Sequence, residues 1–306
     1  MLPHGVCRMN IENTLLFMQR FFFKQATKMK NLLWASLVII LVSVLGRASE
    51  TETPLGYLQG LNSPDHHLIQ SEGLGRSFHV FVRLPEGYKE ATKPYPVVYL
   101  LDGGHTFPML ASYYRYLSFA GELEDLIIVG ISYGTDDWKK GNLRSTDFTA
   151  AAPNRKHYGG APNFQKFLET ELLPFVEGHY RTKPDRRIIF GQSLGGQFVL
   201  YTAQTKPALF WGHIASNPAL HRNLDFFLQQ KPENTQTSSR LYVAGGSLDD
   251  PVFRAPALLW MQYWAGVTQK PWGLQMETLE GEGHFSAAPQ SFRRGLKWLF
   301  AAVSED

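Results

Sequence analysis

The sequence predicts an α/β fold with a mainly parallel central sheet and helices on both faces. Residues 95–101 and 126–131 are continuous apolar runs, which is the pattern of strands covered on both faces. Helical patterns follow at 164–180 and 194–204, with further strands between and after them. Strands that alternate with helices favour parallel pairing, because each helix carries the chain back to the same edge of the sheet.

The remaining predicted elements continue this alternation. Residues 77–84 alternate between apolar and polar side chains, which indicates a half-buried strand that ends at a Pro-Glu-Gly turn. We expect the other strands at 187–190, 214–216, 241–244 and 274–279, and the other helices at 255–267 and 287–303.

Residues 49–306 are predicted to form a single domain, because they contain no internal repeat and no linker long enough to divide them. Residues 49–75, rich in Gly, Ser and Thr, are expected to wrap the surface. Residues 136–160 and 221–238 are polar insertions that carry aromatic residues. Loops of this length in a compact domain are often functional.

The first 48 residues have the pattern of an export signal. A short basic stretch includes Lys30, residues 32–45 contain no charge, and small residues follow. This predicts a secretory signal peptide cleaved after Ala48, with Met29 as the true start and residues 1–28 as an extension. The apolar run is short for a membrane span, which takes about 20 residues. A retained anchor and a buried helix are the weaker alternatives. The expected location is periplasmic or secreted, without stable membrane insertion once the signal is cleaved.

Cleavage would change the charge and remove the one cysteine. The whole chain has 30 Lys and Arg against 27 Asp and Glu, but residues 1–48 hold six basic residues and one acidic residue. The exported part would therefore carry a net charge of −2, which gives no reason to expect nucleic-acid binding. Loss of Cys7 would exclude thiol catalysis and a cysteine metal site. We expect neither a cofactor nor a metal; the oligomeric state stays open.

A nucleophile motif lies between a predicted strand and a predicted helix. Residues 191–195 read Gly-Gln-Ser-Leu-Gly, which matches G-x-S-x-G, with an apolar strand just before and a helix just after. A strand, a sharp turn and a helix together project the serine from the top of the sheet, and the glycines permit the turn. Ser193 is therefore the candidate nucleophile. The alternative is a glycine-rich turn with an inert serine.

A serine nucleophile needs a base, and the base needs an orienting acid; here both should follow the serine in the chain. His284 lies in a glycine-rich stretch between the last predicted strand and the last helix, so it is the expected base. Asp249 and Asp250 follow the strand at 241–244. We prefer Asp249 as the acid and keep Asp250 as the alternative, since Asp250 also fits a helix cap beside Pro251.

Two backbone N–H groups are expected to hold the oxyanion. Leu194 opens the helix after the serine, where free N–H groups and the helix dipole favour negative charge. The second donor should follow an early buried strand, and Gly104 is preferred there, with the N–H of His105 as the alternative. The His105 side chain is expected to face the substrate.

Two other histidines follow the serine in the chain. His213 lies in a strand-like run and is expected to have a packing role or to lie on the surface. His221 lies at a loop tip and is expected to face the substrate.

Several segments, in their order along the chain, resemble the putative-esterase family of α/β-hydrolases. They are residues 99–103, 171–176, 180–181, 191–196, 207–210 and 215–218. The resemblance implies an α/β-hydrolase fold over about residues 75–300. The family includes trilactone siderophore esterases, feruloyl and acetylxylan esterases, S-formylglutathione hydrolases and mycolyltransferases. The export signal favours the periplasmic siderophore-esterase branch.

The resemblance also has implications for substrate binding. In siderophore esterases, arginines near the mouth hold catecholate groups, and Arg144 falls in the matching loop. Some members use a Ser-His dyad, which would leave Asp249 and Asp250 without a catalytic role. The chain departs from the family at 216–220, where Ser-Asn-Pro-Ala-Leu replaces Ser-Pro-Ser-Leu-Trp, so the pocket wall differs.

The sequence therefore predicts a serine esterase that hydrolyses a small-molecule ester through an acyl-enzyme, with a siderophore trilactone as the favoured substrate. The alternatives are an acyltransferase, a feruloyl or acetyl-carbohydrate esterase on the same fold, and a non-catalytic binding module. Activity is expected to rise with pH as His284 loses its proton.

Overall fold

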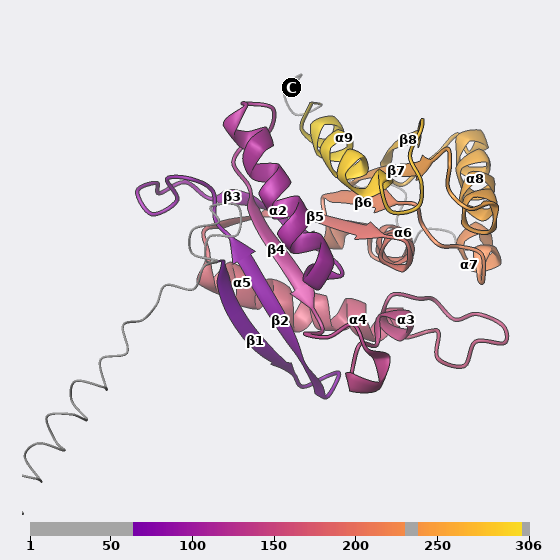
Figure 1. Cartoon of the computed structure of the whole chain (residues 1–306), viewed down its shortest axis with the longest axis horizontal. Coiled ribbons are helices and arrows are strands. Elements are labelled where there is room, and N and C mark those ends of the chain that lie inside the picture. Colours follow the sequence, from indigo (N-terminus) through magenta and orange to yellow (C-terminus); the bar gives the residue numbers. More distant parts are fainter. Residues whose placement is uncertain (1–63, 230–237, 302–306) are drawn as a thin grey trace, which may run out of the picture. The chain divides into compact units, whose positions relative to one another are not determined.

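One sheet of eight strands organises the computed structural model, which describes residues 64–229 and 238–301 (Figure 1). The strand order is β1-β2-β4-β3-β5-β6-β7-β8. β1 pairs antiparallel with β2, and β2 pairs antiparallel with β4, whereas all later pairs are parallel. The strands are β1 (Asp65–Ser71), β2 (Arg76–Arg83), β3 (Tyr95–Leu100), β4 (Ile127–Ser132), β5 (Thr182–Gln192), β6 (Gly212–Ser216), β7 (Arg240–Gly246) and β8 (Gly273–Leu279).

Helices cover both faces of the sheet, which explains the continuous apolar strands. Along β3, Val97 and Tyr99 belong to one buried core, whereas Val98 and Leu100 belong to the other. Successive side chains of a strand point to opposite faces, so a strand with two cores has no polar side. α2 (Gly103–Phe119) and α9 (Ala287–Ala301) pack on one face; α4 (Ala161–Phe167), a π-helical turn (Leu168–Leu172), α5 (Leu173–His179), α6 (Leu194–Thr205), α7 (Leu224–Gln229) and α8 (Pro251–Gly266) pack on the other (Figure 1).

The predicted fold class is confirmed, but several elements were not expected from the sequence, and β1 and α2 are the longest of them. β1 lies within residues 49–75, which we expected to wrap the surface. It is an edge strand with mostly exposed polar side chains, and so it lacks an apolar pattern. α2 was also missed, because it opens on two glycines and contains Pro108, which weaken any helix signal. α2 positions the loop at the end of β3, and so it matters for the site.

The insertion at 136–160 contains two short helical segments, a 3-10 turn (Trp138–Lys140) and α3 (Arg144–Asp147). A last 3-10 turn, Pro207–Leu209, leads into β6. The described residues fall within one compact unit, Leu58–Asp306. The predicted signal peptide, residues 1–48, lies outside the described residues. Within the described ranges, no helix has the length and apolarity needed to cross a bilayer.

His213 provides a test of the core, because it is a titratable group in the middle of the sheet. Its side chain is fully buried in β6 and packs edge-on against Phe210. Burial lowers the pKa of His213 from 6.5 to about 3. Below pH 6.5 the unfolded chain therefore binds a proton that the folded chain does not. The stability should fall as the pH decreases from 6.5 towards 3, by about 2 kcal/mol at pH 5.

The corresponding experiment is urea unfolding of the wild type and of His213→Leu at pH 7 and pH 5. The leucine variant should lose about 2 kcal/mol less than the wild type between these two pH values, because it no longer has the titrating group. His157→Gln is the matched control, since His157 is exposed. Equal losses in the wild type and His213→Leu would contradict this prediction.

Candidate active site

Ser193 occupies a sharp turn between β5, which ends at Gln192, and α6, which begins at Leu194. Its backbone has φ 60° and ψ −116°, a conformation that residues with a side chain rarely adopt. Its N–H donates to the Ser216 carbonyl at 3.0 Å, and its carbonyl accepts from the Ala219 N–H at 3.0 Å. The turn is therefore held by the loop that follows β6, which offsets the strained backbone.

Glycine is required at the flanks of this turn. A Cβ atom at Gly191 would lie 2.3 Å from the carbonyl of Gly195, and one at Gly196 would lie 2.8 Å from the carbonyl of Ser216. Gly191 thus lets α6 approach β5 closely, and Gly196 lets it approach the end of β6.

A chain of hydrogen bonds joins three of the predicted residues. His284 Nε2 lies 3.0 Å from Ser193 Oγ, and His284 Nδ1 lies 2.9 Å from Asp249 Oδ2 and 3.0 Å from Oδ1. The Asp249 side chain is 3% exposed and that of His284 is 13% exposed, so water has little access to the carboxylate. The imidazole also packs against the Phe253 ring, with 4.6 Å between the centroids. This is the arrangement of a nucleophile, a base and an orienting acid.

Asp250 has a different place from its neighbour. Its carboxylate accepts the N–H of Val252 at 2.8 Å and caps α8, which begins at Pro251. The side chains of consecutive residues diverge here, and only Asp249 reaches the imidazole. The capping geometry is the alternative that the sequence already suggested for Asp250.

Two amide side chains hold the main chain of the loop that carries His284, residues 280–286, which we call the histidine loop. Sequence reasoning did not single out either amide. Asn217 Nδ2 donates to the carbonyls of Gly283 and His284 at 3.2 and 3.1 Å, and its Oδ1 accepts the Gly246 N–H at 2.9 Å. Gln192 Nε2 also donates to the His284 carbonyl. Asn217 therefore connects the loop after β6 to the end of β7 and to the histidine loop. The signal was an Asn-Pro pair after a strand, which marks a turn but not the bonds of its amide.

The proposed oxyanion donors lie at the starts of two helices. Leu194 is the first residue of α6, and Gly104 is the second residue of α2. The first N–H groups of a helix have no carbonyl acceptor within that helix, so helix formation leaves both of these N–H groups available to a ligand. The N–H of His105, by contrast, donates to the Asp102 carbonyl at 2.9 Å. The geometry therefore favours Gly104 over His105 as the second donor.

A cavity of about 930 Å³ opens beside Ser193 and His284. Arg144 and His105, the two residues expected to contact the substrate, both line it. The Arg144 guanidinium donates two hydrogen bonds to the Asp102 carboxylate. The His105 imidazole pairs with the Asp136 carboxylate at 2.8 Å, and the side chains of His105 and Asp136 are mostly exposed. The rest of the wall combines apolar groups (Met109, Phe253, Phe285, Ala288) with polar ones (Thr106, Ser132, Tyr133, Thr135, Asn142, Gln192, Asp250).

The structure does not bring His221 to this cavity wall. Its ring packs edge-on against Phe253 at 4.9 Å, and Phe253 in turn contacts His284. His221 therefore lies one layer behind the cavity. Burial, followed by the charges of Arg222, Arg155 and His284, lowers the pKa of His221.

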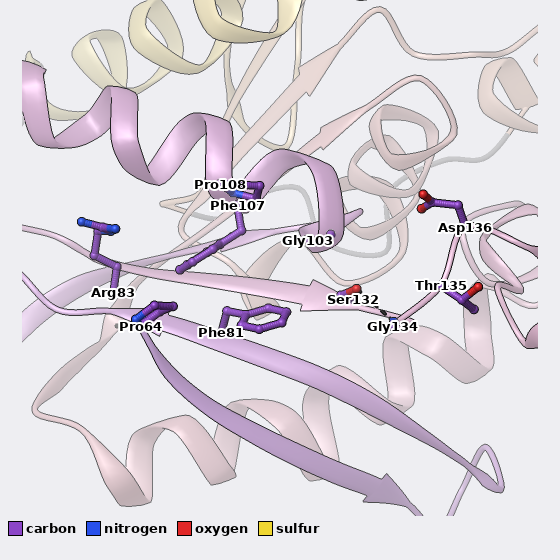
Figure 2. A pocket seen from close by; sticks show the side chains of 11 residues that line it. Pro64, Phe81, Arg83, Gly103, Phe107, Pro108, Ser132, Gly134, Thr135 and Asp136 are labelled. Carbon is purple, nitrogen blue, oxygen red and sulfur yellow. Dashed lines mark hydrogen bonds between the residues drawn. The ribbon is translucent and has the colours of Figure 1, made fainter. Parts of the chain in front are cut away.

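Figure 2 shows side chains that line a second cavity, of about 410 Å³. Both cavities are lined by Gly104, Ser132, Thr135 and Asp136. The rings of Phe81 and Phe107 form part of its wall, with 5.7 Å between their centroids. The first turn of α2 thus separates two cavities. Among residues 64–229 and 238–301, no three His, Cys, Asp or Glu side chains are grouped as metal ligands.

Comparison with known proteins identifies the family. The model of the family described as "Putative esterase" matches residues 71–301. The chain belongs to this putative esterase family. The predicted resemblance is therefore confirmed, and with it the α/β-hydrolase fold.

The relatives of this chain are esterases and hydrolases. Ferri-bacillibactin esterase BesA of Bacillus subtilis is 31% identical over 258 residues, which cover 76% of this chain and 87% of BesA. The apo-salmochelin esterase of Escherichia coli is 30% identical over 165 residues, which cover 51% of each chain. The solved structure of an IroE-like serine hydrolase from Shewanella oneidensis aligns with a TM-score of 0.69 at 25% identity and covers 78% of this chain and 80% of that one. The family assigns this chain to the hydrolases that act on ester bonds.

Proposed function

We propose that this protein is a serine esterase that hydrolyses a carboxylic ester through an acyl-enzyme. The hydrogen-bond chain from Ser193 through His284 to Asp249, beside a large cavity, is the observation that supports this most strongly. Asp249 holds the imidazole with its proton on Nδ1, so that Nε2 is free to accept the proton of the serine.

In the first half of the reaction, the Ser193 Oγ attacks the ester carbonyl carbon and His284 Nε2 takes its proton. The N–H groups of Leu194 and Gly104 stabilise the resulting oxyanion. When the ester C–O bond breaks, His284 donates that proton to the departing alcohol oxygen, and the acyl group stays on Ser193. In the second half, His284 takes a proton from water, whose oxygen attacks the acyl carbon. The acid leaves, and His284 returns the proton to Ser193 Oγ.

The proposed substrate class is a siderophore ester with several ester bonds, of which a catecholate trilactone is the simplest probe. Two similar proteins are named as esterases of ferri-bacillibactin and apo-salmochelin. A cavity of about 930 Å³ is large enough for such a substrate to bring one of its ester bonds to Ser193. The proposed location, periplasmic or secreted, depends on the sequence of residues 29–48 alone.

The test of the substrate class is a panel of purified-protein hydrolysis assays. It compares a catecholate trilactone, a feruloylated sugar, an acetylated sugar and p-nitrophenyl acetate. We expect kcat/KM for the trilactone to exceed that for each sugar ester by at least about 10²-fold, because its larger binding surface contributes to transition-state stabilisation. Hydrolysis of p-nitrophenyl acetate without any turnover of the trilactone would exclude the siderophore class and retain the esterase. Inertness towards all four would contradict the esterase itself.

A further inference from the structure

Asp102 has an unusual backbone at an important point of the site. It lies between β3 and α2, two residues before Gly104, with φ 53° and ψ 42°. A non-glycine residue in this left-handed region is uncommon and requires stabilisation by its surroundings. The Asp102 side chain makes no capping bond to α2. This side chain is therefore available for a contact outside α2.

Arg144 makes that contact. Its Nε lies 2.7 Å from Asp102 Oδ1 and its Nη2 lies 2.8 Å from Oδ2, which is the paired geometry of the strongest Arg–carboxylate interactions. The Asp102 side chain is 13% exposed and that of Arg144 is 32% exposed. The pair is thus shielded from water more than an ordinary surface pair, and it accounts for two of the five guanidinium N–H groups.

Arg144 itself is held by contacts with Asn142 and Phe148. It opens α3, and its backbone N–H donates to Asn142 Oδ1 at 3.1 Å. Its guanidinium lies over the ring of Phe148, 5.8 Å from the centroid, and Phe148 is 1% exposed. The long insertion after β4 therefore supplies a rigid support for Asp102.

Asp102 in turn contacts both segments that carry the proposed oxyanion donors, the first turn of α2 and the first turn of α6. Its carbonyl accepts the N–H groups of His105 and Thr106 at 2.9 and 3.0 Å, which forms the first turn of α2. Its carboxylate Oδ2 lies against the first turn of α6, 3.5 Å from where a Cβ atom of Gly195 would be. Gly104 lines both cavities, so this turn has a cavity on two sides. Through its carbonyl and its carboxylate, Asp102 contacts this turn and the start of α6 at the same time.

We propose that Arg144 is a positioning residue: by pairing with Asp102, it fixes the Gly104 N–H relative to the Leu194 N–H. The inference rests on the proposed function, since it concerns the oxyanion site of that reaction. It differs from the role that the family resemblance implies, in which Arg144 binds a substrate anion. A positioning role predicts the same loss of kcat on neutral and anionic esters, whereas a substrate-binding role predicts an effect on the anionic ester alone.

The experiment compares Arg144→Gln and Arg144→Lys with the wild type on a neutral ester, p-nitrophenyl acetate, and on an anionic one, p-nitrophenyl hemisuccinate. A positioning role predicts that kcat of Arg144→Gln falls by about 10²-fold on both esters, as expected for a misplacement of about 1 Å, while KM changes by less than about three-fold. The lysine variant should recover only part of kcat, because an ammonium cannot make the paired contact. Arg155→Gln, from the same insertion, is the control and should keep the wild-type kcat on the neutral ester.

Asp102→Asn provides a second route if an Arg144 variant does not fold. Asparagine tolerates the left-handed backbone and still accepts one N–H, so a loss of about 10-fold in kcat is expected. The double variant Asp102→Asn/Arg144→Gln should be no worse than Arg144→Gln alone, because both changes remove the same contact. Circular dichroism and the melting temperature establish that each variant is folded.

The results separate this inference from the proposed function. A higher KM for the hemisuccinate alone, with full kcat on the acetate, would overturn the positioning role and establish substrate binding. Full activity of Arg144→Gln and Asp102→Asn on both esters would also overturn it. A wild-type protein that hydrolyses neither ester would instead contradict the proposed function.

Discussion

Alanine at Ser193 is expected to lower kcat for ester hydrolysis by about 10⁶-fold. The change removes the oxygen that forms the acyl-enzyme, whereas the oxyanion donors and the cavity remain. The fold should persist, because alanine meets the same backbone strain at φ 60° as serine does. Initial rates with p-nitrophenyl acetate measure the loss. Mass spectrometry after treatment with a fluorophosphonate should show one adduct on the wild type and none on the variant.

A matched serine outside the site controls for this experiment. Ser77 lies in β2, where its hydroxyl donates to Gln70 on the neighbouring edge strand. Ser77→Ala should keep the wild-type kcat and the fluorophosphonate adduct. If Ser193→Ala retained more than about a hundredth of the wild-type kcat, the nucleophile would have to be another residue.

The sharp turn that carries Ser193 could be predicted from the sequence because its determinants are local. The apolar strand, the glycines and the following helix are adjacent in the chain, and each imposes a constraint that the sequence displays. The close approach of Gly191 to Gly195 is the physical reason for the motif. The order of the later strands also limited the positions of the base and the acid, so His284 could be chosen, and the acid narrowed to Asp249 or Asp250, before any geometry was known.

The supports of the site could not be predicted, because they join segments far apart in the chain. The amide of Asn217 bonds to the His284 carbonyl, 67 residues away, and Arg144 pairs with Asp102, 42 residues away. Neither pair follows from a spacing rule, and α2, which carries the proposed second oxyanion donor, has a weak helix signal. His221 shows the same limit. Its place at a loop tip suggested a ring that faces the substrate, whereas the ring packs against Phe253, behind the cavity wall.

Asparagine at Asp249 is expected to lower kcat by about 10⁴-fold, with little change in KM. The amide is close in size to the carboxylate, but its NH₂ group can donate to Nδ1 of His284. That contact would favour the imidazole with its proton on Nε2, which cannot take the proton of Ser193. It would also remove the charge that stabilises the imidazolium. The measurement is kcat and KM on p-nitrophenyl acetate for folded Asp249→Asn.

Asp250 is the matched comparison, since it is the adjacent carboxylate and caps α8 instead of bonding to His284. Asp250→Asn should lose less than about 10-fold in kcat, and Asp250→Ala should destabilise the fold by about 1 kcal/mol, because only the alanine removes the cap on Val252. Equal losses in kcat for the two asparagine variants would mean that the carboxylates act through a shared field rather than through the bond to His284. Full activity of Asp249→Asn would establish a Ser-His dyad. The buried carboxylate at 2.9 Å would then serve only to fix the histidine loop, together with the amides of Asn217 and Gln192.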